Sequence, residues 1–209
     1  MTWLLCACAL LTAAASAELA PAKGRLLVAT EVVGGDLFAE TVILLLEYGD
    51  AGAMGLVVNR PTDVALGELL EDAEEIPDPP PTIYWGGPLA MSTLSALVHR
   101  DAPAESADTI IESVVRLPFD AALENAATDP ASVRFYLGYA GWAPGQLDYE
   151  LARDSWHVLP ASDEIVFSED PKRLWQRLKP AQQYRAALQS IQKAGHPAPK
   201  AAYPRVVPE

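Results

Sequence analysis

Cysteine is nearly absent from this 209-residue chain, since its two cysteines are Cys6 and Cys8 near the N-terminus. A chain that has lost its first residues would therefore have no disulfide framework, no thiolate nucleophile and no cysteine-based zinc site. His99 has no second His or carboxylate at metal-binding spacing, so we expect no metal. Neither a Walker motif nor a dinucleotide fingerprint is present, and we expect no cofactor.

Basic residues are also few, 15 Lys and Arg against 28 Asp and Glu, for a formal net charge of −13. This balance disfavours direct nucleic-acid binding, which depends on attraction to phosphate. The charge is uneven: residues 18–170 carry seven basic and 27 acidic side chains, and residues 171–209 carry eight and one. A basic C-terminal helix pair lying on an acidic body would explain this asymmetry, and a partner-binding tail is the alternative.

No hydrophobic run is long enough to span a bilayer, so we expect no transmembrane segment in the mature chain. Trp3–Leu11 is a short apolar run, and Ala15-Ser16-Ala17 fits the small-residue cleavage pattern of a signal peptide over residues 1–17. Cleavage after Ala17 would place the protein in the periplasm or otherwise outside the cytoplasm. No Lys or Arg precedes the apolar run, so a non-functional leader and a cytoplasmic protein remain the alternative.

Half of the residues are hydrophobic and 21% are charged, which is typical of a globular domain. The patterns predict strands at 26–33, 42–46, 53–59, 82–85, 94–99, 109–115 and 133–137. The strand at 94–99 is the expected partner of the strand at 82–85. Residues 156–159 and 165–167 are expected to form a closing hairpin. Helices are predicted from Thr62 or Asp63 through Leu70, from a capping Asp120 through Ala127, from Pro144 to Leu151, over 172–179 after Asp170-Pro171, and over 181–194.

The stretch Arg134–Leu151 concentrates glycine and aromatic residues in one strand-turn-helix transition. Gly138 and Gly141 are expected to break the strand, because glycine permits backbone angles and close approaches that a side chain forbids. Pro144 suits the first turn of the following helix, whose apolar edge would be Leu147 and Leu151.

Three sequence blocks in this order and spacing resemble the AlgH/YqgE family of bacterial proteins. They are 53–61 (AMGLVVNRP), 84–88 (YWGGP) and 135–151, which contains GYAGWAPGQL. The resemblance covers residues 24–178 and implies an α+β fold, a bifurcated, mostly antiparallel sheet folded into a pseudo-barrel with flanking helices. We assign residues 24–179 to this domain and 180–209 to a C-terminal extension, basic and helical, with a proline-rich tail. The resemblance implies no chemistry, because the family is known mainly as uncharacterised, with a suggested link to the regulation of gene expression.

The chain departs from the family pattern in four ways, one of which is the extension past Lys179, which is not the usual family ending. Tyr48 stands where relatives often carry His, and Asp148 stands where they usually carry Glu. Members are ordinarily thought of as cytosolic, so the leader is a third departure.

Several polar residues are candidates for a site, each with a structural alternative. Arg60 offers a planar fork suited to a carboxylate or phosphate, or pairs with one of the many carboxylates, while Asn59 would serve turn backbone groups. Gly86-Gly87 either presents N–H groups to an anion or makes a tight turn. Gln146 and Glu150 share a helix face, whereas Asp148 and Glu150 point apart.

We hypothesise a non-enzymatic binding or regulatory domain with a polar and aromatic groove at strand ends, whose partner is a protein or a small anionic ligand. The alternative is a hydrolase or transferase using His99 or Glu150 with Arg60, although the isolated His99 is more simply a satisfied structural residue. A packing domain that acts only within an assembly is a third possibility. The predicted binding residues are Asn59, Arg60, Trp85, Gly86, Gly87, Tyr139, Trp142, Gln146 and Glu150.

Overall fold

The computed structural model describes residues 19–35, 37–69, 76–100 and 109–179. The predicted leader (1–17) and the predicted helix over 181–194 lie outside the described residues. No helix in the described part of the chain is both long enough and apolar enough to cross a membrane.

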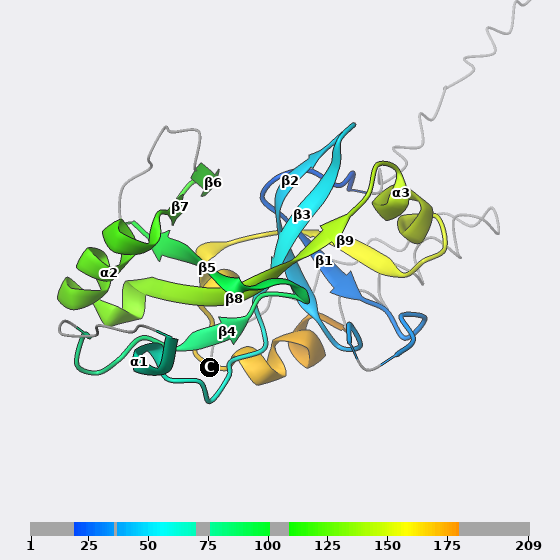
Figure 1. Cartoon of the computed structure of the whole chain (residues 1–209). Coiled ribbons are helices and arrows are strands. Elements are labelled where there is room, and N and C mark those ends of the chain that lie inside the picture. The colour runs from blue at the N-terminus through cyan, green and yellow to red at the C-terminus, as the bar shows by residue number, and fades with distance from the viewer. Residues whose placement is uncertain (1–18, 36, 70–75, 101–108, 180–209) are drawn as a thin grey trace, which may run out of the picture.

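One curled sheet organises the described chain (Figure 1). Its order is β6-β7-β5-β8-β3-β2-β1-β9, and β4 joins it through β8. The β4–β8 pair is parallel, and the remaining strand pairs of the described sheet are antiparallel. The strands are β1 (Arg25–Ala29), β2 (Val42–Gly49), β3 (Gly52–Val57), β4 (Ile83–Trp85), β5 (Leu89–His99), β6 (Thr109–Ile111), β7 (Val114–Leu117), β8 (Val133–Trp142) and β9 (Trp156–Pro160).

Strand β8 holds the two halves of the sheet together, because it pairs with β3 near its end and with β4 and β5 along its length. It continues to Trp142, beyond the predicted end of the strand at residue 137. Gly138 instead allows a local change of direction inside the strand, with φ of +70°. A Cβ at this position would lie 2.4 Å from the Gly87 carbonyl oxygen, so glycine also permits the close contact with the chain after β4.

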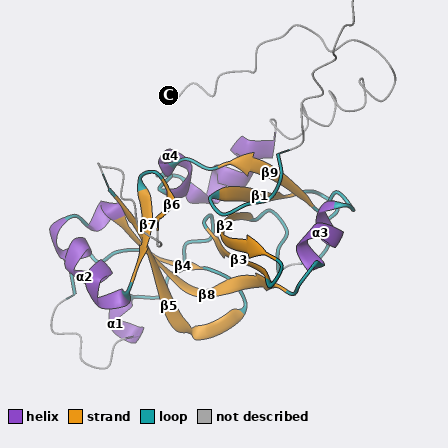
Figure 2. Ribbon diagram, turned by 90° about the horizontal axis from the view of Figure 1, so that it is seen from above, coloured by secondary structure: helices purple, strands orange, loops and turns teal. Residues whose placement is uncertain are grey.

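Helices cover the outside of the sheet (Figure 2). α1 (Leu66–Leu69) and α2 (Phe119–Thr128) lie at one end, and α3 (Gln146–Leu151) lies at the other (Figure 1). α4 (Asp163–Val166) follows β9, and a 3₁₀ turn at Pro171–Arg173 leads into helical residues 174–179. Leu174 and Trp175 are buried in the core, as the predicted apolar face requires.

The core consists of three clusters of buried side chains on the two sides of the curled sheet. One contains Leu26, Leu44, Tyr136 and Trp175, a second contains Ile43, Trp142 and Trp156, and a third packs α2 onto Phe135. This half-barrel of antiparallel strands with a few outer helices confirms the predicted α+β fold class.

Two predicted pairings are wrong. Residues 165–167 do not form a hairpin with 156–159, since α4 begins after Ser162, whose carbonyl oxygen accepts from the N–H groups of Ile165 and Val166. β9 pairs with β1 instead. Strand β4 pairs with β8 and not with β5, so its partner is a strand distant in sequence that local patterns do not reveal.

Smaller boundaries also differ from the predictions. The strand predicted over 109–115 is a hairpin of β6 and β7, with its turn at Glu112-Ser113. Asp120 lies in the first turn of α2 and does not cap it, because Pro118 is the capping residue. Proline supplies the extended backbone of this position without a side-chain hydrogen bond.

Candidate functional site

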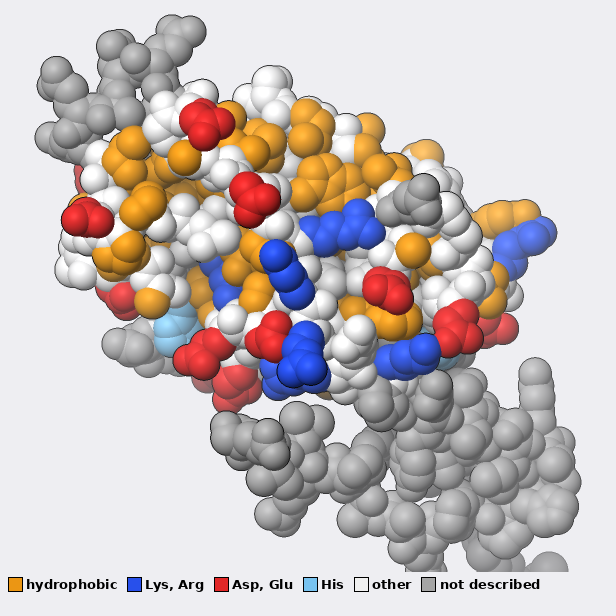
Figure 3. Space-filling model, turned by 90° about the horizontal axis from the view of Figure 1, so that it is seen from below, with side chains coloured by type: hydrophobic (Ala, Val, Ile, Leu, Met, Phe, Trp, Pro, Cys, Tyr) orange, Lys and Arg blue, Asp and Glu red, His pale blue; other side chains and the backbone are white. Residues whose placement is uncertain are grey.

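An open groove of about 580 Å³ lies where the segment before β2, the turn after β3, the end of β4 and the C-terminal 3₁₀ turn meet. Seen from this side, the molecule shows hydrophobic side chains gathered beside Lys and Arg side chains, with separate acidic side chains between them (Figure 3). The groove has the size of a site for a small organic molecule. Its lining residues are Leu37, Ala39, Glu40, Asn59, Arg60, Pro61, Thr62, Trp85 and Lys172.

Asn59 fixes one wall of the groove. Its side chain is 6% exposed, accepts from the Val42 N–H at 2.8 Å and donates to the Glu40 carbonyl oxygen at 2.9 Å. Glu40 has a left-handed backbone with φ of +57°, which is uncommon for a residue with a side chain. The Asn59 amide therefore serves backbone groups, as the structural alternative for this residue expects, and it holds Glu40 in a strained conformation.

Arg60 fixes the same wall by bonding to the segment just before Glu40. Its two terminal nitrogens donate to the carbonyl oxygens of Leu37, at 2.6 Å, and Ala39, at 2.9 Å. Its guanidinium also lies over the Trp85 ring, 5.0 Å from the ring centroid. Burial lowers the pKa of this guanidinium below its ordinary value, and the nearby Glu40 carboxylate acts in the opposite direction. The Arg60 fork thus shapes the groove by donating to two backbone carbonyl oxygens.

Two hydrogen-bond donors of the groove have no acceptor among the described residues. Trp142, Trp156 and Trp175 each donate their indole N–H to an oxygen of the protein. The Trp85 indole N–H has no such acceptor among the described residues, and it is not one of their fully buried, unpaired side-chain atoms. Lys172, exposed on the opposite wall, likewise makes no hydrogen bond or ion pair with a described residue.

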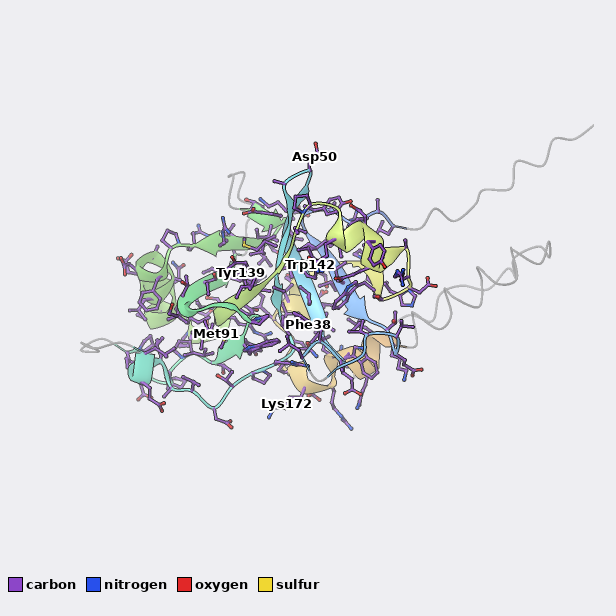
Figure 4. The ribbon with its side chains drawn as sticks, turned by 45° about the vertical axis from the view of Figure 1, so that its right-hand side comes forward. Phe38, Asp50, Met91, Tyr139, Trp142 and Lys172 are labelled. Carbon is purple, nitrogen blue, oxygen red and sulfur yellow. The ribbon has the colours of Figure 1, made fainter. Side chains whose placement is uncertain are left out.

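A row of aromatic rings runs from the groove into the second core cluster. Phe38 lies 6.0 Å from Trp85 and 6.2 Å from Trp156, and Trp156 lies 6.1 Å from Trp142, all between ring centroids. Phe38 lies between Trp142 and Lys172 in the view of Figure 4. Aromatic packing thus ties the groove wall to the region around α3.

Glu150 organises the far end of this row. One carboxylate oxygen accepts from the indole N–H groups of Trp142, at 2.9 Å, and Trp156, at 2.7 Å. The other oxygen accepts from Gln146 at 2.9 Å, which confirms that these two residues share a helix face. All of these contacts position side chains of the protein, and the cluster lies outside the groove lining.

Asp148 points away from Glu150, as predicted, and accepts a hydrogen bond of 2.6 Å from the Tyr48 hydroxyl. This bond joins the β2–β3 hairpin to α3. It raises the pKa of Tyr48, and partial burial and the charges of Asp148 and Asp50 act in the same direction. The Tyr48 hydroxyl and the Asp148 carboxylate are therefore direct hydrogen-bond partners.

The remaining predicted binding residues have packing roles. A Cβ on Gly86 would lie 2.3 Å from the Gly138 carbonyl oxygen, and one on Gly87 would lie 2.2 Å from the Tyr139 carbonyl carbon. The Gly86 N–H donates to the Leu137 carbonyl oxygen, and the Gly86 carbonyl oxygen accepts from the Val57 N–H, so Gly86 bonds to the backbone on both sides. Tyr139 packs against the first core cluster and is not part of the groove lining.

His99 has the partners of a structural residue. Its Nε2 lies 3.1 Å from an Asp163 carboxylate oxygen, and its ring packs 5.8 Å from Phe167. Neither Arg60 nor Glu150 contributes to this contact, so the catalytic set considered for a hydrolase or transferase is dispersed over three separate places. No group of three or more His, Cys, Asp or Glu side chains within the described ranges could hold a metal ion.

The structure thus brings Asn59, Arg60 and Trp85 together, but separates them from Trp142, Gln146 and Glu150. Sequence reasoning missed Glu40 and Lys172 as groove residues. A positive φ at a glutamate leaves no mark in a sequence, and Lys172 is one of several basic residues in its segment. Pro171 correctly predicted a helical turn at this position, but the sequence did not indicate that the turn lies beside the groove.

A family model and individual sequence relatives assign the chain to the same family. A family model described as AlgH-like matches residues 26–187. The chain belongs to the AlgH-like family. It is 34% identical over 167 residues to UPF0301 protein SCO2948 of Streptomyces coelicolor, a match that covers 77% of this chain and 86% of the relative. It is 31% identical over 158 residues to a UPF0301 protein of Chlorobaculum parvum, covering 74% and 83%.

Two solved structures support the AlgH-like fold. The solution structure of the AlgH protein from Pseudomonas aeruginosa is similar with a TM-score of 0.59 and 30% identity, covering 87% of this chain and 95% of that one. The crystal structure of protein DIP2367 from Corynebacterium diphtheriae has a TM-score of 0.65 and 26% identity, covering 76% and 86%. These AlgH-like relatives carry names that state no activity, so function must be argued from the site.

Proposed function

We propose that this AlgH-like chain is a non-enzymatic binding domain, and that the groove between the Asn59-Arg60 turn and Lys172 takes a small ligand bearing a carboxylate or similar acceptor group. The observation that carries the proposal is the pair of donors, Trp85 Nε1–H and Lys172 Nζ, that have no acceptor among the described residues. Unpaired donors in a preformed groove favour a ligand rich in acceptors.

The charge of the chain supports this choice. Residues 18–170 contain seven basic side chains, and one of them, Arg60, lines the groove that Lys172 also lines. A local concentration of cationic groups on a protein with a net charge of −13 gives an anion a specific place to bind against the general repulsion.

Catalysis is less well supported. The groove lining contains no His, Cys or Ser, and its one hydroxyl, on Thr62, donates to the Ile83 carbonyl oxygen at 2.9 Å. A nucleophile would need an adjacent base, which Thr62 lacks. A role in regulation would follow from the identity of the ligand.

The test is an NMR titration of the full-length protein with 4-methylpentanoate, a carboxylate with a compact apolar body. Measurement at low ionic strength keeps the charge interactions unscreened. The variant Lys172→Glu should weaken binding about three- to tenfold. The matched control Arg173→Glu changes the same charge one residue away, outside the groove lining, and should leave binding near the wild-type value. Equal affinities for both variants, or no binding to the wild type, would refute the proposal.

A further inference from the structure

We propose that the groove ligand is a zwitterion: an amino acid, or a compound that likewise carries a carboxylate, an ammonium group and a compact apolar side chain. This inference rests on the proposed function, because it concerns the same groove and specifies its ligand. The carboxylate would meet Trp85 Nε1–H and Lys172 Nζ, and the ammonium group would meet Glu40.

Glu40 is the residue that a purely anionic ligand leaves unexplained. Its exposed side chain lines the groove, and its charge is felt by the Arg60 guanidinium, but no hydrogen bond or ion pair joins the Glu40 carboxylate to a described residue. A bound anion would be repelled by this carboxylate, which lowers the affinity of a simple acid. An ammonium group on the ligand converts the repulsion into attraction and discriminates against ligands that lack it.

The backbone at Glu40 supports a specific role for its position. Its φ of +57° is a conformation that costs free energy in a residue with a side chain. The buried Asn59 amide holds it, through bonds to the Glu40 carbonyl oxygen and the Val42 N–H on either side of Thr41. The other two non-glycine residues with positive φ among the described residues, Ala90 and Asp154, lie outside the groove. A strained acidic residue, clamped at the rim of a groove, is in keeping with ligand recognition.

The rest of the lining suits the apolar part of such a ligand. Leu37, Ala39 and Pro61 supply apolar surface, and Leu37 is 50% exposed. An exposed leucine beside a groove gains by covering its surface with an apolar group. A volume of about 580 Å³ accommodates an amino acid or a dipeptide.

The experiment compares four probes on the full-length protein by NMR titration at low ionic strength. L-Leucine has both charges, 4-methylpentanoate lacks the ammonium group, L-leucinamide lacks the carboxylate, and the dipeptide Leu-Leu separates the two charges. Leucine or Leu-Leu should bind about three- to fivefold more tightly than either singly charged probe, the range expected of one exposed ion pair. A preference for leucine indicates a free amino acid, and a preference for Leu-Leu indicates a peptide, with the same chemistry.

The variant Glu40→Gln should abolish the preference over 4-methylpentanoate without weakening the binding of that acid. Glu68→Gln, an exposed acidic residue on α1 outside the groove lining, is the matched control and should retain the preference. If leucine and 4-methylpentanoate bind equally, Glu40→Gln has no effect, and Lys172→Glu still weakens both, the zwitterion inference fails and the proposed function stands. If no probe binds, or Lys172→Glu matches Arg173→Glu, both fail.

Discussion

Replacing Asn59 by Ala tests whether the amide that forms the groove wall also stabilises the fold. The Val42 N–H, on a fully buried residue, would lose its acceptor, and the Glu40 carbonyl would lose its donor. An unsatisfied buried group costs about 1–3 kcal/mol, and the more exposed Glu40 carbonyl is partly rehydrated. We therefore expect a loss of about 2–4 kcal/mol in the free energy of unfolding, equivalent to roughly 4–16 °C in Tm for a domain of this size.

Urea unfolding followed by circular dichroism measures this loss, with two further variants as controls. Asn59→Asp keeps an acceptor for Val42, but it buries a carboxylate with one oxygen against the Glu40 carbonyl oxygen, so at neutral pH it should be at least as destabilised as Asn59→Ala. Asn125→Ala removes an amide that donates to Ala121 within α2, and it should change stability by less than about 0.5 kcal/mol, because Ala favours the helix. The reasoning is refuted if Asn59→Ala unfolds like the wild type, or if Asn59→Asp is as stable as the wild type.

Three substitutions and one mass measurement test separate parts of the chain. Glu150→Ala should cost about 2–4 kcal/mol in urea unfolding, because two buried indole N–H groups lose their acceptor; unchanged stability would contradict the structural role. Gly87→Ala should prevent stable folding or cost more than about 3 kcal/mol, since its Cβ would overlap the Tyr139 backbone; a melting curve like that of the wild type would exclude this packing. Burial raises the pKa of Asp163, but hydrogen bonds from His99 and from backbone N–H groups outweigh this effect and lower it overall. Its stabilisation is therefore present above the unfolded pKa, about 3.9, and is lost as pH falls through the lower folded pKa, so the stability difference from Asp163→Asn should shrink below about pH 4 in acid titrations; a constant difference would contradict it. Intact-mass analysis of the natively expressed protein should find a chain that begins at Glu18 if the leader is cleaved, and a full-length cytosolic chain would exclude export.

The sequence predicts most strand positions because the strands carry local periodicity, whereas several strand pairs join segments distant in sequence. The hairpin of β2 and β3 follows from its Gly-Asp-Ala-Gly turn, and the buried face of residues 174–178 follows from helical spacing. α4 is different, since the β-branched Ile165 and Val166 suggest a strand in isolation. Backbone bonds to Ser162 and the buried Arg134, which donates to the Val166 and Ser168 carbonyl oxygens, select the helical turn. Tertiary contacts override local propensity there.

In the candidate site, too, some features can be recognised from the sequence and others depend on tertiary contacts. Asn59, Arg60 and Trp85 are recognisable from sequence because they lie at strand ends beside turns. Trp142 and Glu150 look equally suited to a site, yet each is the other's hydrogen-bond partner. Sequence spacing cannot distinguish an indole N–H that is satisfied from one that is not, and that distinction separates Trp85 from the other described tryptophans.

The most direct test of the account follows the indole N–H resonances of the full-length protein during titration with L-leucine. Trp85 has an unpaired donor in the groove, whereas Trp142, Trp156 and Trp175 donate to protein oxygens. We predict that the Trp85 resonance shifts with added leucine and that the other three stay in place. A shift of Trp142 or Trp156 with Trp85 unchanged, or no shift at all, would contradict the groove as the binding site.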